Sequence, residues 1–158
     1  MTLETERERH AFKVPNWCLS SRAHTVFGMI AMRKHRPAGE KPLYWVGSAK
    51  KDLLEFPEEV VDNIGYALGV VQYGGHPPSA KPWKGLGPGV NEIVEDDASG
   101  TYRAVYTVRF RKAVYVLHAF QKKSPSGVRT ARPDVRLIED RLAAAREDYE
   151  ERYGEAKD

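Results

Sequence analysis

The side chains best suited to binding a polyanion gather between Arg103 and Arg136. This window holds nine lysines and arginines and a single acid, Asp134, so its net charge is +8. The whole chain carries only +3, so the remainder sums to −5. Concentrated positive charge attracts phosphates and raises the local concentration of a nucleic acid. We therefore expect a polyanionic partner for this part of the chain.

A second group of candidate residues lies in the loop at residues 76–90, which is dense in proline and glycine. Lys81 and Lys84 flank Trp83 there. Two cations beside an aromatic ring can hold a phosphate while the ring stacks on a base. Alternatively, Trp83 packs against the edge of a sheet and both lysines are solvated. The sequence does not separate these two interpretations.

Two further side chains could carry protons. His118 titrates near neutrality in its ordinary state and is a candidate acid or base. Its position beside Leu117 and Phe120 is equally typical of a buried histidine with satisfied hydrogen bonds. Glu92 is either a base or the ion-pair partner that orients an arginine, and we favour orientation.

Length and composition indicate one globular domain. The chain has 158 residues, of which 41% are hydrophobic and 30% charged, enough for a buried core. Its single cysteine, Cys18, excludes an internal disulfide framework and a multi-cysteine zinc site, and favours a reducing, cytoplasmic setting. The longest apolar run, 26–32, is far shorter than the roughly 18 residues of a membrane span. We expect neither membrane insertion nor secretion.

Periodicity predicts an α+β domain. A short strand at 43–46 precedes a segment with apolar residues at spacings of three and four, which predicts a helix with one buried face. Pro57 interrupts that helix, so we expect a kink or two helices. Strands follow at 90–95, 102–110 and 113–121, and a last helix begins near Pro133. The predicted fold is a small, curved, antiparallel or mixed sheet of about four strands, with an N-terminal helix pair, a C-terminal helix and all helices on one side.

Pairing rules bring the candidate residues to one face of this sheet. A two-residue turn at 111–112 would set Arg103 opposite Phe120, and a turn at 96–101 would set Glu92 opposite Val105. Directly opposed residues share a face. One face would then hold Glu92, Arg103, Arg109, His118 and Lys122. The face toward the helices would hold Tyr102, Ala104, Tyr106, Val108, Tyr115 and Leu117.

Four stretches resemble the RelE/ParE toxin superfamily, specifically its phage-derived HigB-like subgroup. They are LYWVGSAKKDLLEFP, GGHPPSAKPWKGLGPGVNEI, GTYRAVYTVRF and AVYVLHAFQKKSPSG. The resemblance covers about residues 41–149. It implies a RelE-like fold and the toxin of a type II toxin–antitoxin pair, encoded beside a helix-turn-helix antitoxin. Typical relatives cut messenger RNA on the ribosome without a metal, so the implied partners are the ribosome and mRNA and no cofactor is implied.

The same resemblance leaves other activities open. ParE relatives poison DNA gyrase on the same fold, and an inactive RNA-binding phage remnant is a further alternative. RNA cleavage by the 2′-OH needs a base, cations for the phosphorane and an acid for the leaving oxygen. Arg103 matches the strand arginine that holds the scissile phosphate. The candidate catalytic set is Lys84, Glu92, Arg103, His118 and Lys122. The candidate RNA-binding set is Lys81, Trp83, Arg109, Lys123 and Arg129.

The sequence patterns at the two ends of the chain allow more than one interpretation. Several relatives use a C-terminal tyrosine in the active site, whereas Tyr149 here fits a buried helix stripe as well as a catalytic role. Residues 1–40 show no lasting period. They are a loose tail, a docking arm, or upstream sequence before a later start at Met29 or Met32. We expect an extension at 1–40, a toxin domain at 41–153 and a tail at 154–158.

Overall fold

The computed structural model describes residues 38–122 and 131–154, which form an α+β fold around one five-stranded sheet. The sheet order is β1-β5-β4-β3-β2, in which β1 runs parallel to β5 and every other pair is antiparallel. The elements are β1 (Leu43–Trp45), α3 (Ala49–Leu54), α4 (Glu58–Gln72), β2 (Ala80–Pro82), β3 (Val90–Asp97), β4 (Gly100–Thr107), β5 (Val114–Gln121) and α5 (Arg132–Tyr153). The predicted fold class, with a helix pair before the sheet and one helix after it, is confirmed.

The sheet has one strand more than the four expected. Strand β2 lies inside the segment that the sequence predicted as a loop, and it pairs with β3 through only three residues. Such a short edge strand leaves no period to detect, and its last residue, Pro82, is typical of a sheet edge. The extra strand matters for function because it brings Lys81 into the sheet.

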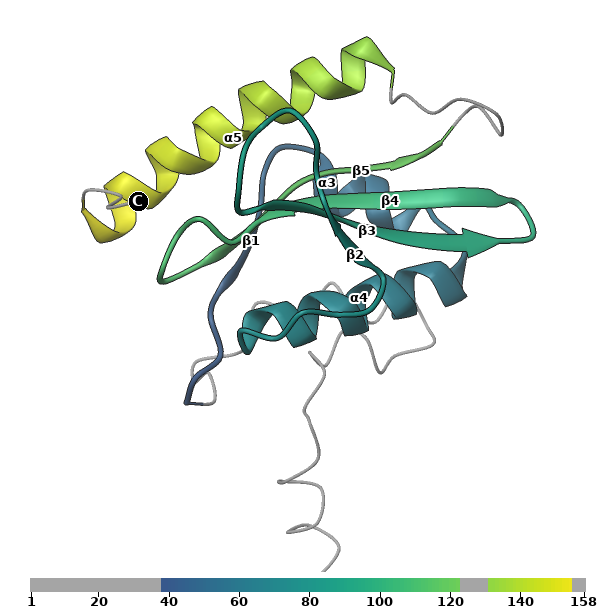
Figure 1. Cartoon of the computed structure of the whole chain (residues 1–158), viewed down its shortest axis with the longest axis horizontal. Helices are drawn as coiled ribbons and strands as arrows, with labels where there is room; N and C mark the ends of the chain where they lie inside the picture. The colour runs from purple at the N-terminus through teal and green to yellow at the C-terminus, as the bar shows by residue number, and fades with distance from the viewer. Residues whose placement is uncertain (1–37, 123–130, 155–158) are drawn as a thin grey trace, which may run out of the picture.

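Helices cover both faces of the sheet, so the prediction that all helices lie on one side is wrong. Figure 1 shows α5 above the strands and α4 below them. Ala104 and Tyr106 belong to the core shared with α3 and α4, whereas Val105 belongs to the core that includes α5 residues Ile138 and Ala145. Successive residues of β4 are therefore buried on opposite faces. Strands apolar on both faces need cover on both.

The predicted register holds across β3 and half of β4. Val94 lies opposite Arg103 and Glu92 opposite Val105, as expected. Between β4 and β5, Arg103 pairs with Phe120 and Val105 with His118, as expected, but a bulge then shifts the pairing by one residue. The bulge turns Tyr115 and Leu117 toward α5, so the predicted shared face of Tyr102, Ala104, Tyr106, Tyr115 and Leu117 is wrong.

The predicted two-residue turn at Arg111-Lys112 is also wrong. Strand β4 ends at Thr107 and β5 begins at Val114, so residues 108–113 form a longer connection. A tight hairpin turn needs positive φ, which neither arginine nor lysine favours. No residue other than glycine has a positive φ within the described ranges. Arg109 therefore lies outside the strand on which it was predicted.

Pro57 divides the helical segment as expected. Helix α3 ends at Leu54, and α4 begins at Glu58 directly after Pro57. The helices bury the predicted apolar positions, including Leu53, Val60 and Ile64, in the core with the sheet. Each such side chain contributes about 1.5–3 kcal/mol when fully buried. Gly74, at φ +82°, follows the end of α4.

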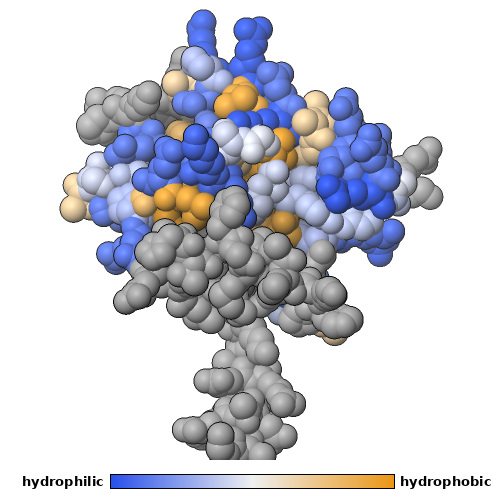
Figure 2. All heavy atoms as spheres, turned by 180° about the vertical axis from the view of Figure 1, so that it is seen from behind, coloured by the Kyte–Doolittle hydropathy of each residue, from blue (hydrophilic) through white to orange (hydrophobic). Residues whose placement is uncertain are grey.

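The outer surface is mainly hydrophilic, with small hydrophobic areas between polar side chains in the view from behind (Figure 2). Within the described ranges, no helix combines the length and apolar character needed to cross a membrane. The predicted extension at 1–40 lies almost wholly outside the described residues, and so do the predicted RNA-binding residues Lys123 and Arg129.

Candidate functional site

The face of the sheet that α5 covers has two chemically different ends. One end, here called the aromatic end, consists of Tyr44, Trp83, Phe110, Tyr115, Tyr149 and Tyr153. The other, here called the charged end, consists of Lys81, Glu92, Arg103, His118 and Lys122. Both ends lie on one face because opposed residues share a side of the sheet.

The charged end is assembled by register across four strands. Lys81 lies opposite Glu92, Glu92 opposite Val105, and Val105 opposite His118. Arg103 lies two residues from Val105 along β4, on the same face. Lys122 follows β5, and its backbone N–H donates to the Thr101 carbonyl at 2.8 Å, which continues the ladder. The alternation of β5 then turns Lys122 to the side of His118.

Arg103 and Glu92 form the centre of this end. The Nη1 of Arg103 donates to Oε2 of Glu92 at 2.8 Å, and the two side chains are 18% and 13% exposed. The Nε of Arg103 is buried and has no hydrogen-bond partner. A buried donor without an acceptor costs about 1–3 kcal/mol. The carboxylate therefore fixes the guanidinium by one nitrogen and leaves another donor unused.

The lysines stand at different distances from this pair. From the strand spacing and rise, the Cα of Lys122 lies about 8 Å from that of Arg103, and the Cα of Lys81 lies about 12 Å from it. Lys81 is exposed and Lys122 half-buried. Within the described ranges, neither lysine forms an ion pair. Long flexible side chains at these positions can approach one phosphodiester segment together.

Lys84 and Trp83 lie elsewhere. Lys84 is exposed in the loop after β2, at the aromatic end, so it is not beside Arg103. Trp83 is only 6% exposed and packs in the core with Val90 and Phe110. Its ring is therefore not available to stack on a base, and the packing interpretation fits. Its indole N–H is buried without an acceptor.

Arg109 holds the loop that carries Lys84. Its Nε donates to the carbonyl of Pro88 at 2.7 Å, and its Nη2 donates to the carbonyl of Leu86. Gly89, at φ +81°, lies so close to this side chain that a Cβ would stand 2.7 Å from Cγ of Arg109. The guanidinium is thus occupied by the protein itself, which does not fit its predicted role on the Arg103 face.

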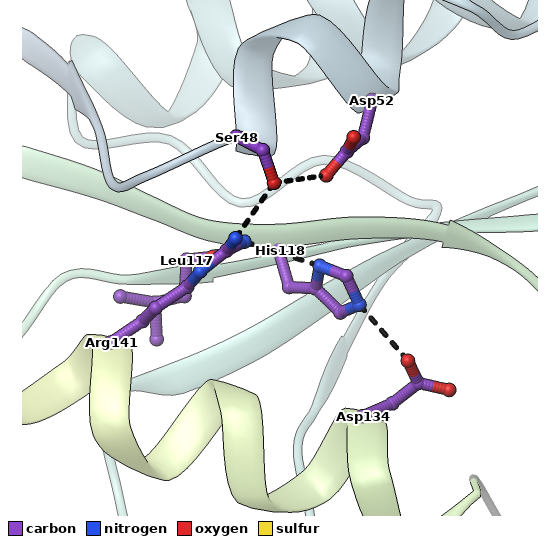
Figure 3. A network of polar contacts seen from close by, with 6 residues as sticks. All are labelled: Ser48, Asp52, Leu117, His118, Asp134 and Arg141. Carbon is purple, nitrogen blue, oxygen red and sulfur yellow. Dashed lines mark hydrogen bonds and ion pairs between the residues drawn. The ribbon is translucent and has the colours of Figure 1, made fainter.

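His118 is a buried histidine with both ring nitrogens engaged. It is 7% exposed, and its Nε2 lies 3.1 Å from Oδ1 of Asp134 while its Nδ1 lies 3.3 Å from Nη1 of Arg141 (Figure 3). No ring nitrogen is left to exchange a proton with a substrate. No group of three or more potential metal ligands occurs in the parts of the chain that are described.

The aromatic end fixes the second half of α5. Phe110 stacks on Tyr149 with ring centroids 4.8 Å apart, and the Tyr115 hydroxyl donates to Asp148 at 2.7 Å. The hydrogen bond from Arg152 lowers the pKa of Asp148, and burial raises the pKa of Tyr115. Tyr149 is 5% exposed and serves the core. The buried stripe that the sequence predicted for this helix is confirmed.

The basic window does not form a single patch. Lys112 lies in the connection between β4 and β5, over the ring of Tyr153 at 5.5 Å, and so at the aromatic end. Lys122 lies at the other end of β5. Arg132 and Arg136 are exposed on α5. The positive charge of this window, which lies in one stretch of the sequence, is therefore spread over separate parts of the structure.

Comparison with known families gives one match. The family model described as Phage derived protein Gp49-like (DUF891) matches residues 51–143. This range runs from α3 into α5 and includes every residue of the charged end, whereas Tyr44, Tyr149 and Tyr153 fall outside it. No curated protein matches the chain.

Proposed function

Because the chain belongs to the phage-derived Gp49-like family, a family of RelE/HigB-type toxins, we propose that it is a toxin that cleaves messenger RNA on the ribosome. The partners that follow are the ribosome, mRNA and a helix-turn-helix antitoxin. The ribosome and antitoxin rest on the resemblance to the superfamily. The choice of cleavage rests in addition on the chemistry of the charged end.

The single observation that supports cleavage most strongly is the state of Arg103. Glu92 holds one nitrogen of its guanidinium, while the buried Nε has no partner. A guanidinium offers paired donors that match two phosphate oxygens. Because Nε is buried, a phosphodiester reaches it only after the side chain turns outward, and it would then satisfy the unused donor. Its developing negative charge would be stabilised most when the pentacoordinate phosphorus forms.

The reaction that suits these groups is attack by the ribose 2′-oxygen. A base removes the 2′-OH proton, the O2′–P bond forms, the P–O5′ bond breaks, and a proton passes to the leaving O5′. The products are a 2′,3′-cyclic phosphate and a 5′-hydroxyl. We assign proton transfer to Lys122 and Lys81, because His118 has no free ring nitrogen. Glu92 orients Arg103, and Lys84 binds RNA away from the scissile phosphate.

The test is to induce the chain in growing cells and map messenger 5′ ends. The proposal expects growth arrest with new cuts inside translated codons, lost in Arg103→Ala. Arg111→Ala is the matched control, since Arg111 is an exposed cation in the β4–β5 connection. Growth arrest with intact transcripts and damaged DNA would contradict the proposal and favour a gyrase-binding toxin. Normal growth with intact transcripts, in cells that accumulate the folded protein, would favour an inactive remnant.

A further inference from the structure

A chain of polar contacts crosses the junction between α5, α3 and β5 (Figure 3). Arg141 of α5 lies at its centre. Its Nη1 donates to the Leu117 carbonyl at 2.9 Å and to Nδ1 of His118 at 3.3 Å, and its Nη2 donates to Oγ of Ser48 at 2.7 Å. The Ser48 hydroxyl in turn donates to Asp52 at 2.7 Å.

The bulge in β5 explains why Arg141 is needed there. His118 pairs with Val105 and Val116 pairs with Tyr106, so Leu117 between them has no partner on β4. A bulge leaves backbone groups outside the ladder, and a buried carbonyl without a donor is costly. Arg141 supplies that donor. One arginine therefore ties the irregular point of β5 to the start of α3.

The contacts define the protonation state of His118. Arginine is always charged and can only donate, so the Arg141 contact requires an unprotonated Nδ1. The proton of a neutral imidazole then lies on Nε2 and is donated to Asp134. We propose that the contacts of Arg141 form only while His118 is neutral. When His118 takes up a proton, the contact between Arg141 and the imidazole ring breaks.

The direction of the pH effect follows from the two neighbours of the His118 ring, Arg141 and Asp134. A second proton on Nδ1 would set an N–H against the N–H of Arg141, and a positive charge against a positive charge. The same proton strengthens the hydrogen bond to Asp134. Acid therefore releases Arg141, with the Leu117 carbonyl and Ser48, while Asp134 stays bound. The contacts of Arg141 therefore require a neutral His118 ring and are lost at lower pH, when the ring takes up a second proton.

The charged groups near His118 come from four other elements and from the end of its own strand. Asp134 and Arg141 approach from α5, and Asp52 acts from α3 through Ser48. On the sheet, Arg103 lies diagonally across on β4 and pairs with Glu92 on β3. Lys122 follows on the same strand. Asp134 holds the Nε2 side of the ring and Arg141 holds the Nδ1 side, so a proton on Nδ1 breaks the contact on one side only.

The tautomer is tested without any substitution. Imidazole nitrogen shifts of the full chain, measured by NMR at about pH 7.5, should show Nδ1 unprotonated and Nε2 protonated for His118. The proposal is overturned if the proton lies on Nδ1 at that pH. It is also overturned if His118 is already an imidazolium there.

Hydrogen exchange tests the opening. Between about pH 7.5 and about pH 5.5, protection of α3 and of the turn of α5 around Arg141 should fall roughly tenfold relative to α4, because charge-assisted hydrogen bonds are lost. Helix α4 is the internal reference, since it does not share these contacts. Equal changes in all three helices would contradict the proposal.

Two substitutions separate the two sides of the ring. His118→Asn keeps an acceptor near the Nδ1 position but cannot titrate, so α3 should stay protected at both pH values. His118→Gln keeps a donor near Nε2 and loses the Arg141 contact, so α3 should be unprotected at both. A His118→Asn variant that responds to pH as the native chain does would overturn the proposal. If neither variant folds, the tautomer and exchange results on the native chain decide.

Discussion

The aromatic end and the charged end lie on one face of one sheet under one helix, yet their side chains are used in opposite ways. At the aromatic end, Tyr44 and Tyr153 share a hydrogen bond of 3.0 Å, and Asp148 accepts hydrogen bonds from both Tyr115 and Arg152. At the charged end, Arg103 keeps a buried donor without an acceptor and the two lysines have no ion-pair partner within the described ranges.

This contrast indicates that the aromatic end stabilises the fold and that the charged end is the part suited to bind a ligand. Stacked rings with hydrogen-bonded hydroxyl groups hold α5 in place, and the Trp83 N–H, a buried donor without an acceptor at this end, is uncharged. At the charged end, the buried Arg103 donor that has no acceptor lowers the stability of the fold. Helix α5 bridges the two, since its second half docks through rings and its first half through the His118 contacts.

The largest expected effect is on stability at the aromatic end. Phe110→Ala removes a ring that is 4% exposed and packs on both Tyr149 and Tyr115. The free energy of unfolding, from urea titration, should fall by about 3–5 kcal/mol. Arg111→Ala, next in sequence and exposed, should change it by less than about 0.5 kcal/mol. Equal effects of the two would show that the aromatic end does not hold α5.

A smaller effect, on RNA cleavage, is expected when Glu92 at the charged end is substituted. Glu92→Gln keeps the shape and one acceptor but removes the charge that fixes Arg103. RNA cleavage should fall about tenfold, in line with a lost charged hydrogen bond, while the pH profile of kcat/KM keeps its shape. If Glu92 were the general base, the acid limb of that profile would disappear in the variant.

Acid should weaken the aromatic end through Asp148. The bond from Arg152 lowers the pKa of this carboxyl in the folded protein, so its contribution is complete above the unfolded pKa of about 4. That contribution is lost as the pH falls through the lowered pKa. Asp148→Asn should therefore flatten the acid fall of unfolding free energy, whereas Glu147→Gln, an exposed neighbour, should leave it unchanged. Identical acid profiles for both variants and the native chain would refute this.

The smallest effect concerns Lys84. Lys84→Ala should weaken RNA binding only a few-fold and reduce the slope of log affinity against log salt by about one. The measurement is fluorescence anisotropy with a labelled oligonucleotide over a series of salt concentrations. Lys51→Ala, an exposed lysine of α3, should leave the slope unchanged. A loss as large as that of an Arg103 variant would move Lys84 into the catalytic group.

Local signals in the sequence predicted the elements and much of the charged end. Pro57 predicted the break between α3 and α4, and the turn at 96–101 predicted the β3–β4 register that sets Glu92 beside Arg103. These depend on residues close in sequence, so pattern and turn chemistry suffice. The pairing of Arg103 with Phe120 also held, because the bulge lies beyond it.

The predictions from sequence that were wrong depended on tertiary contacts. The bulge at Leu117 is stabilised by Arg141, which is 24 residues away. Burial of Trp83 and capture of Arg109 by the loop carbonyls each need elements that are distant in sequence. The second layer of helix was missed because Ala104 to Thr107 of β4 is buried on both faces, which alternation alone does not reveal.

Arg103 is the residue that we propose binds the scissile phosphodiester. The direct measurement is cleavage of a defined mRNA on purified, stalled ribosomes by the native chain and by Arg103→Ala, with unfolding free energy measured on both. We predict a rate roughly 100- to 1,000-fold lower for the variant, as for loss of one transition-state donor, with its fold intact. A folded Arg103→Ala protein that cuts at the native rate would contradict the account.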